Sequence, residues 1–258
     1  MPKPLILVTN DDGIYSPGIY FLQQEVAKIG RTIVFAPESE KSAVGHAITI
    51  SDPIRIRKLS RRNGFSGYAV GGTPADCVKL GVKAILDIPP DIIVSGVNLG
   101  SNMGMNILYS GTVSAATEGV ILGIPSIAIS VDSHKEPDYT VAAKICAKFV
   151  KIVLENGISK GTALNINVPN VKEDEIKGVR LTRQGHSYYE EDFDRRVDPR
   201  ERIYYWMDGR LIPSENDPEL DDIAVQENWI SVTPLHYNLT DLQSFNEMRN
   251  WEIFINEE

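Results

Sequence analysis

The 258-residue sequence predicts an α/β fold: a three-layer sandwich with a mostly parallel sheet between two layers of helices. Short apolar runs typical of buried strands alternate with amphipathic helix patterns, and turn residues stand where the runs end. The composition, 42% hydrophobic and 24% charged, is that of a globular protein and excludes disordered, collagen-like and coiled-coil chains. Such alternation forms right-handed βαβ units, so the carboxyl ends of the strands meet at one edge of the sheet.

The first expected elements are a buried strand at 5–9, a helix and a second buried strand at 32–36. Ser16 is the expected N-cap of the helix and Pro17 its first residue. Gly30 is expected to end it.

The pattern continues with a helix that begins at the capped segment 73–76. Buried strands are expected at 91–95 and 126–130, with a helix over 111–123 between them. The longest amphipathic helix is expected over 138–155.

After a strand at 163–168 the pattern changes. A strand is expected at 179–182, and a β-hairpin follows with strands at 203–207 and 210–213. Asp208-Gly209 is its expected type I′ turn, because this pair tolerates positive φ. The last elements are a strand at 229–235 and a C-terminal helix opened by a capping box at 240–243.

The chain is expected to form one domain over 1–258, since no repeat or low-complexity linker divides it. Its core is expected at about 1–180 and 229–240, its hairpin arm at about 184–215 and its C-terminal helix at about 241–255. A hairpin this small cannot fold alone, so it packs on the body or on another subunit.

Two cysteines, Cys77 and Cys146, are too few for a disulfide framework, and both lie in helical apolar patterns. We expect reduced core thiols in a cytoplasmic protein. The start has no signal-length apolar stretch and no later segment reaches membrane-spanning length, so no membrane partner is expected.

The net charge of -9 argues against a grip on duplex nucleic acid, which basic surfaces bind. Residues 1–130 hold 11 Lys and Arg against 10 Asp and Glu, whereas residues 131–258 hold 15 against 25. Small phosphorylated ligands of the near-neutral front half are therefore not excluded, since salt screens exposed charges beyond about 8 to 10 Å.

Three polar loops follow strands that end at the same predicted edge. The first is Asn10-Asp11-Asp12-Gly13. Adjacent carboxylates at an apolar strand end repel each other and resist burial unless a cation lies between them. The alternative is a polar turn whose aspartate caps the next helix.

The second loop, 37–46, contains Ser42, Gly45 and His46 within five positions. Alone it also fits an ordinary solvated loop. Two roles stay open for His46: contact with a substrate, or ordering of the loop.

The third loop, 95–106, has glycines four positions apart together with Asn98 and Asn102. Glycines let backbone N–H groups approach a ligand, and asparagines add neutral donors and acceptors. A helix start at Ser110-Gly111-Thr112 follows and offers a phosphate site, with Ser110 also an N-cap. Neither a dinucleotide-binding glycine motif nor a P-loop is present.

Asp11, Asp12, Ser42 and Asn98 together offer four oxygen ligands for one divalent ion. Such hard donors favour Mg²⁺, Mn²⁺ or Ca²⁺ over zinc. An ion beside a helix N-terminus suits phosphomonoester hydrolysis, because it neutralises phosphoryl oxygens and lowers the pKa of a bound water.

Five motifs in order resemble the stationary-phase survival protein E (SurE) family, and the resemblance spans essentially the whole chain. They are Ile6 to Ile14, Ala36-Pro37 with Ser42 to His46, Gly72 to Asp76, Val94 to Asn98, and Tyr109 to Val113.

The resemblance implies a Rossmann-like core and a metal-dependent nucleotidase acting on nucleoside 5′- and 3′-monophosphates, in some members also on short polyphosphate. It implies one divalent ion, Mg²⁺ or Mn²⁺, on Asp11, Asp12, Ser42 and Asn98. It also implies a homodimer or homotetramer formed through the C-terminal segment and the hairpin.

The hypothesis for mechanism is in-line attack by metal-activated water, with Asp11 or Asp12 as base. Asn102, Ser110, Gly111 and Thr112 hold the phosphoryl oxygens, with Gly45 and His46 as further substrate-side candidates. Two alternatives are a haloacid dehalogenase-type phosphatase, which needs Asp-x-Asp, and a non-catalytic oligomeric sensor of nucleotide or metal. Tyr188, Tyr189 and Trp206 are candidates for stacking on a base.

Overall fold

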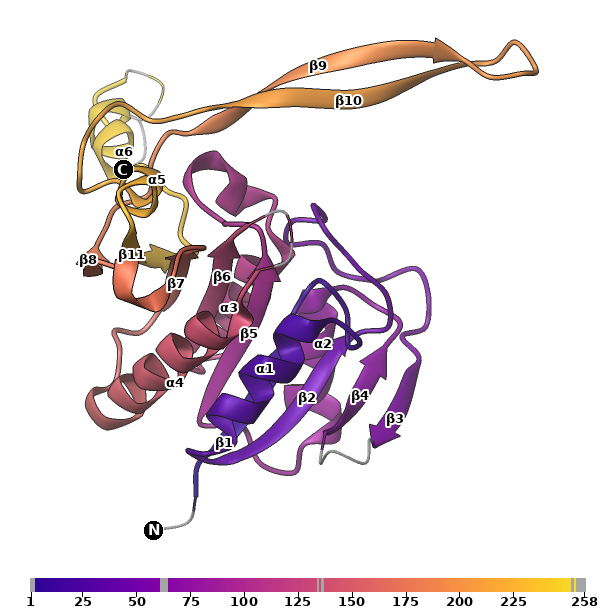
Figure 1. The fold of residues 1–258 in the computed structure, drawn as a ribbon. Helices are drawn as coiled ribbons and strands as arrows, with labels where there is room; N and C mark the ends of the chain where they lie inside the picture. Colours follow the sequence, from indigo (N-terminus) through magenta and orange to yellow (C-terminus); the bar gives the residue numbers. More distant parts are fainter. Residues whose placement is uncertain (1–2, 61–64, 134, 136, 252, 254–258) are drawn as a thin grey trace.

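The structure is a computed structural model that describes residues 3–60, 65–133, 135, 137–251 and 253. Over these residues a nine-stranded sheet with strand order β3-β4-β2-β1-β5-β6-β7-β11-β8 lies between helices (Figure 1). Six neighbouring strands, from β4 to β7 in that order, run parallel, while β3 and β11 pair antiparallel with β4 and β7. The expected α/β fold class is confirmed.

The strands of the sheet follow the expected apolar runs closely, except that β3 and β4 were not expected. Both lie at one side of the sheet, and β3 is mostly exposed, so neither has a continuous apolar run. The strands are β1 (Leu5–Thr9), β2 (Arg31–Pro37), β3 (Ile56–Ser60), β4 (Ser66–Val70), β5 (Ile92–Leu99), β6 (Ser126–Asp132), β7 (Thr162–Pro169), β8 (Gly178–Leu181) and β11 (Trp229–His236).

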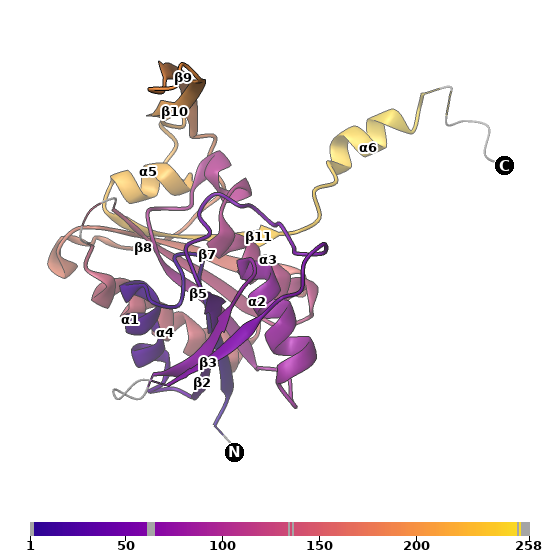
Figure 2. The ribbon, with the colours of Figure 1, turned by 90° about the vertical axis from the view of Figure 1, so that its right-hand side faces the viewer.

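Helices cover both faces of the sheet, as the turned view in Figure 2 shows. Helices α1 (Pro17–Val26) and α4 (Tyr139–Asn156) lie on one face, and α2 (Pro74–Leu80) and α3 (Gly111–Ile121) on the other. Because both faces are covered, burial in the central strands is nearly continuous rather than alternating, and all five residues of β1 are buried.

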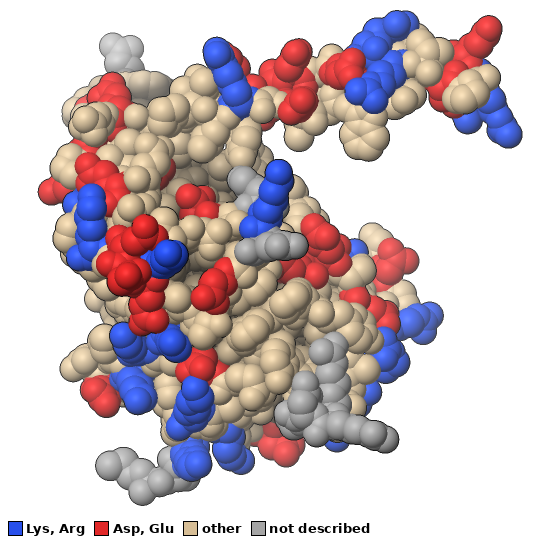
Figure 3. All heavy atoms as spheres, in the orientation of Figure 1, with Lys and Arg blue, Asp and Glu red and all other residues tan. Residues whose placement is uncertain are grey.

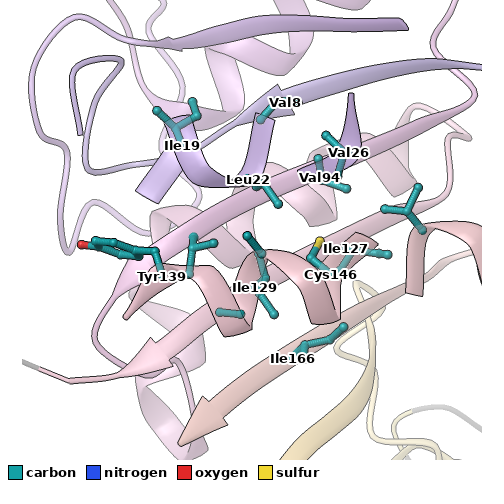
Figure 4. Packing of buried hydrophobic residues seen from close by; sticks show 14 of the residues in the cluster. Val8, Ile19, Leu22, Val26, Val94, Ile127, Ile129, Tyr139, Cys146 and Ile166 are labelled. Carbon is teal, nitrogen blue, oxygen red and sulfur yellow. The ribbon is translucent and has the colours of Figure 1, made fainter. Parts of the chain in front are cut away.

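The larger core cluster lies between the sheet and the α1–α4 face, and Figure 4 shows its packing. Val8 and Ile129 from the sheet meet Leu22 of α1 and Cys146 of α4 there. Leu7 belongs to the cluster on the opposite face, so successive residues of β1 stabilise both layers.

Helix ends follow the expected capping chemistry in part. Thr73 and Asp76 form the expected capping box. Ser16 makes no side-chain cap bond and instead accepts a hydrogen bond from the Asn10 amide, and α1 ends at Val26, before Gly30.

The expected hairpin turn at Asp208-Gly209 is wrong. Both residues lie in the middle of β10 (Ile203–Ile212), which pairs antiparallel with β9 (Tyr188–Val197) over its whole length. The turn is at 198–202, where the Asp198 carboxylate accepts the backbone N–H groups of Arg200 and Arg202. Long-range pairing with β9 therefore overrides the local turn preference of Asp-Gly.

The chain beyond the arm adds α5 (Asp221–Gln226), which was not expected, and α6 (Leu242–Met248). The N-cap of α6 is Asp241 rather than Thr240, since the Asp241 carboxylate accepts the N–H groups of Gln243 and Ser244. The expected helix end at 255 lies outside the described residues.

Cys77 and Cys146 are buried free thiols in α2 and α4, as expected. Burial raises the pKa of both, that of Cys146 to about 12. Across the described part of the chain, no helix combines the length and the apolar character needed to cross a bilayer.

Candidate active site

The Asn10 to Gly13 turn joins β1 to α1 at the carboxyl edge of the sheet. The Asn10 amide donates to the Gly13 carbonyl at 3.0 Å and to Ser16 Oγ at 2.8 Å, so it fixes the turn internally. Gly13 has a φ of +92°, and a Cβ there would lie 3.2 Å from the backbone of Ser39. The positive φ therefore requires a glycine at position 13. The turn holds Asp11 and Asp12, which lie between Asn10 and Gly13, next to the end of β1.

Asp11 is 4% exposed, and its carboxylate accepts the Thr112 hydroxyl from the first turn of α3. Burial is the dominant influence and raises the pKa of Asp11, although hydrogen bonds from the Thr112 side chain and backbone oppose it. Thr112 is therefore directed to Asp11. This contact joins the aspartate turn to the start of α3, which the sequence predicts to bind phosphate.

Asp12 is half-buried beside Asp11. Burial, and then the Asp11 charge, raise the pKa of Asp12 to about 7, although the Leu99 backbone N–H donates to its Oδ2 at 3.2 Å. Glu40 raises the pKa of both aspartates further, so the turn concentrates negative charge that a cation would relieve. Sequence reasoning missed Glu40 because its loop shows no pattern that places it near the pair.

Asn98 lies in β5, which continues past the expected end at Ser95 to Leu99 through an irregularity at Gly96-Val97. The residue is 9% exposed, and its Nδ2 donates to the Gly100 carbonyl at 2.7 Å. The Asn98 Oδ1 is thereby the atom oriented for a ligand, in keeping with an oxygen donor to a cation.

Ser42 lies in the loop after β2, which reaches the aspartate turn through a hydrogen bond from Lys41 N–H to the Asp11 carbonyl at 2.8 Å. The Ser42 hydroxyl donates to Glu40 Oε1 at 2.7 Å. Asp11, Ser42 and Asn98 line one end of the same cleft, which has a volume of about 1210 Å³.

Two predicted phosphate residues line that end of the cleft as well. Ser110 is the N-cap of α3, and its Oγ accepts the Val113 N–H at 3.1 Å. Asn102 is 7% exposed and held on both sides: its Nδ2 donates to Ser130 Oγ and its N–H to Asn167 Oδ1, each at 2.8 Å. Asn167 therefore helps to position Asn102. The apolar pattern of its strand in the sequence did not indicate this role.

Gly45 and His46 lie away from the cleft lining. The Gly45 N–H donates to the Tyr109 carbonyl at 2.9 Å. His46 Nε2 lies 2.9 Å from Glu118 Oε2 on α3. His46 therefore contacts α3, which favours ordering of the loop over contact with a substrate.

The other end of the cleft is formed by the root of the β9–β10 arm. Tyr188, Tyr189, Met207 and Leu211 line it, whereas Trp206 does not and is 60% exposed. The cleft is thus polar at the sheet edge, whereas its arm end combines these aromatic and apolar side chains with the carboxylates of Glu191 and Asp208. It is large enough for a nucleotide.

Asp221 joins the two ends and was missed by sequence reasoning. This fully buried carboxylate accepts N–H groups from Gly104 at 3.2 Å, in the turn η2 (Gly104–Leu108), and from Gly185 at 2.8 Å, just before the arm. A Cβ at Gly104 would lie 2.2 Å from Ser187 Oγ. The site loop and the arm root are packed as one unit.

The donor set at the sheet edge fits a hard divalent ion. Within the described ranges, no three His, Cys, Asp or Glu residues gather as a metal cluster. The available donors are instead the Asp11 carboxylate, the Asn98 amide oxygen and the Ser42 hydroxyl, which line the cleft. The neighbouring Asp12 carboxylate is a fourth donor but does not line the cleft. Oxygen sets of this kind, with few protein carboxylates, suit Mg²⁺ or Mn²⁺.

Comparisons with known proteins agree on one family. Residues 6–191 match the family model described as "Survival protein SurE". The chain is 46% identical over 248 residues to a protein of Syntrophobacter fumaroxidans named 5′-nucleotidase SurE, covering 96% of this chain and 99% of that one. A protein of the same name from Syntrophus aciditrophicus is 49% identical over 91% of this chain and 88% of its own length.

A solved structure is similar as well. The crystal structure of the SurE protein from Aquifex aeolicus superposes with a TM-score of 0.83 at 41% sequence identity. The match covers 95% of this chain and 98% of that chain, so the fold is shared from end to end.

Proposed function

The chain belongs to the survival protein SurE family, and we propose from this premise that it is a 5′-nucleotidase that hydrolyses nucleoside 5′-monophosphates to nucleoside and phosphate. We extend the proposal to metal dependence, to nucleoside 3′-monophosphates and to short-chain polyphosphate. The observation that carries it is the single cleft that runs from the buried Asp11 carboxylate, past the start of α3, to the aromatic arm root.

Asp11, Asp12, Ser42 and Asn98 would hold the divalent ion, Mg²⁺ or Mn²⁺. Crowding and burial of the two carboxylates, which raise the pKa of each, support this assignment, because a bound cation offsets both effects. When bound, the ion neutralises phosphoryl oxygens and makes water more acidic.

The remaining steps belong to side chains and backbone. An aspartate of the turn, Asp11 or Asp12, is the candidate to accept a proton from the attacking water. Ser110, Asn102 and the backbone N–H of Gly111 at the α3 N-terminus hold the phosphoryl oxygens, and Thr112 orients Asp11. In-line attack then proceeds from the aspartate side of the phosphorus.

A haloacid dehalogenase-type mechanism finds no support. It requires a nucleophilic aspartate two positions before Asp12, where this chain has Asn10. The Asn10 amide is engaged within the turn by two hydrogen bonds.

We also propose a homodimer or homotetramer formed through the arm and the C-terminal segment. The two faces of the arm differ in chemistry, which supports this. One face has mainly apolar residues and the other is mainly charged. The apolar face comprises Tyr189, Phe193, Val197, Ile203, Tyr205, Met207 and Leu211. In α6, no residue is buried, and Figure 2 shows this helix projecting from the body.

A phosphate-release screen tests the function. Protein stripped with EDTA is assayed on nucleoside 5′- and 3′-monophosphates and on polyphosphate, with and without added Mg²⁺ or Mn²⁺. We expect release from 5′-monophosphates only after metal is restored. Nucleotide binding by calorimetry without phosphate release would instead favour a non-catalytic sensor.

A further inference from the structure

The loop that carries Ser42 is long and has no regular secondary structure. It spans residues 38–55, between β2 and β3, and none of its residues is buried. A segment of this length without secondary structure is uncommon in a compact domain. Polar contacts, rather than the core, must therefore hold the loop in place.

Hydrogen bonds hold the loop at several points along its length. Backbone hydrogen bonds from Lys41 and Gly45 hold its first part, to the carbonyls of Asp11 and Tyr109. At its middle, the His46 ring reaches across to α3. His46 is therefore the first side chain after Ser42 that ties the loop to a helix.

The partner of His46 is a buried carboxylate that is also paired with a lysine. Glu118 is 3% exposed; its Oε2 lies 2.9 Å from His46 Nε2 and its Oε1 accepts from Lys79 Nζ at 2.6 Å. Burial raises the pKa of Glu118, but the hydrogen bonds from His46 and Lys79 outweigh this and lower it below its usual value. Glu118 is ionised, and without His46 it would still be paired with Lys79.

Glu118 belongs to the same helix whose first turn contacts Asp11. Ser110 and Thr112 at the start of α3 face the cleft and the Asp11 carboxylate, and Glu118 lies about two turns further along. One rigid element thus holds both the helix-start end of the site and, through His46, the Ser42 loop.

We propose that His46 is a positioning residue, which by its contact with Glu118 holds the Ser42 loop against the aspartate turn. The proposal rests on the function proposed above, because Ser42 matters only if it serves the divalent ion. Residues that support metal ligands typically contribute about 10–100-fold to metal affinity or activity. His46 exerts this effect without touching the substrate.

Two variants distinguish this positioning role of His46 from a general effect of the charge on Glu118. His46→Ala and Lys79→Met each remove one partner of Glu118, but only His46 is attached to the loop. We expect His46→Ala to weaken Mn²⁺ binding, measured directly by electron paramagnetic resonance, and to lower kcat/KM, each by about tenfold or more. Lys79→Met should leave both within about twofold of the wild type, because Lys79 contacts Glu118 and not the loop.

A third, conservative variant tests whether a hydrogen bond to Glu118 is sufficient. The amide of a glutamine can donate to Glu118 from near the position of His46 Nε2, so His46→Gln should recover most of the lost affinity and rate. Equal losses in Lys79→Met and His46→Ala would overturn the proposal in favour of the charge on Glu118. Failure of His46→Gln to recover, together with the loss of one limb of the pH–rate profile, would instead make His46 a proton donor or acceptor.

The contact between His46 and Glu118 can also be tested without measuring activity. Hydrogen exchange of the amides at 42–46 should accelerate in His46→Ala and not in Lys79→Met, because only the first variant removes a contact of the loop. Unchanged exchange overturns the proposal. A wild-type protein that neither binds Mn²⁺ nor releases phosphate would overturn the proposed function, and exchange would still decide whether His46 orders the loop.

Discussion

The two ends of the cleft are built in opposite ways. At the sheet edge, Asp11, Asn98 and Asn102 are buried and fixed by hydrogen bonds within the chain. At the other end, β9 and β10 contain no buried residue, and Figure 3 shows the arm standing clear of the body with charges of both signs. The side chains at the sheet edge are thus fixed by contacts within the chain, whereas those of the arm are exposed.

Removing one charge at the sheet edge should have the largest effect. Asp11→Asn keeps the shape of the side chain but loses a metal ligand, so kcat/KM for a nucleoside 5′-monophosphate should fall by about 10³-fold or more. Because burial disfavours the charged form of Asp11, the neutral variant should unfold at the same temperature as the metal-free wild type or higher.

The matched control lies at the opposite edge of the same sheet. Asp91, whose Oδ2 accepts the Leu5 N–H at 2.7 Å, can be replaced by asparagine with that bond retained. Asp91→Asn should keep full activity. If Asp11→Asn were as active as Asp91→Asn, the assignment of chemistry to the sheet edge would fail.

The sheet edge was predictable from sequence because its signals are local. A buried run followed by two aspartates, and a capped helix start at Ser110, each lie within a few consecutive residues. Contacts between distant residues could not be predicted in the same way. Glu118 is 72 positions from His46, and Asp221 is 117 positions from Gly104.

In the arm, by contrast, a strong local signal in the sequence predicted the wrong turn. Asp208-Gly209 is a strong local turn signal, yet ten consecutive residue pairs between β9 and β10 override it. The turn forms instead around Asp198, where several hydrogen bonds close a longer loop. Sequence thus predicted that a hairpin exists there, and cross-strand pairing decided where it turns.

Disrupting the apolar face of the arm should have the next largest effect, on assembly rather than chemistry. Phe193 is 60% exposed on this face, and Phe193→Asp should weaken self-association by about 10–100-fold, the loss of one well-packed interface side chain. Tyr204→Asp, on the opposite face of the same hairpin, is the control. Sedimentation velocity over a concentration series measures both.

Identical sedimentation of the wild type and Phe193→Asp would contradict the role of this face. A change in kcat for Phe193→Asp much larger than the change in KM would contradict the division between the two ends. In that case assembly would control the chemistry at the sheet edge.

The carboxylates of the aspartate turn and of the turn at the tip of the arm should also respond oppositely to pH. The pKa of Asp12 is raised from its ordinary value of 3.8 to about 7, so the metal-free folded protein binds more protons than the unfolded chain between about pH 4 and 7. This contribution therefore lowers stability as pH rises through that window. Asp198 in the arm turn has a lowered pKa, so its contribution is lost as pH falls.

Metal binding should reveal the Asp12 contribution directly. Mn²⁺ displaces the proton, so the apparent affinity should rise about tenfold per pH unit up to about pH 7 and then level off. Thermal unfolding and Mn²⁺ titration between pH 5 and 8 test this, with Asp12→Asn as the reference. A wild-type affinity that is flat over this range would show that no proton competes with the ion.

The smallest effect is expected at the arm end of the cleft. Tyr189 lines it, and stacking of a base on an aromatic ring contributes about 1 kcal/mol or more, so Tyr189→Ala should raise KM about fivefold to tenfold with kcat nearly unchanged. Trp206→Ala is the matched control, because Trp206 lies on the opposite face of β10, outside the cleft lining. Comparing AMP with ribose 5-phosphate isolates the base, since the sugar phosphate lacks it. Equal losses for both substrates would mean that Tyr189 acts on the sheet edge through the arm root, and the two ends of the cleft would then not be independent.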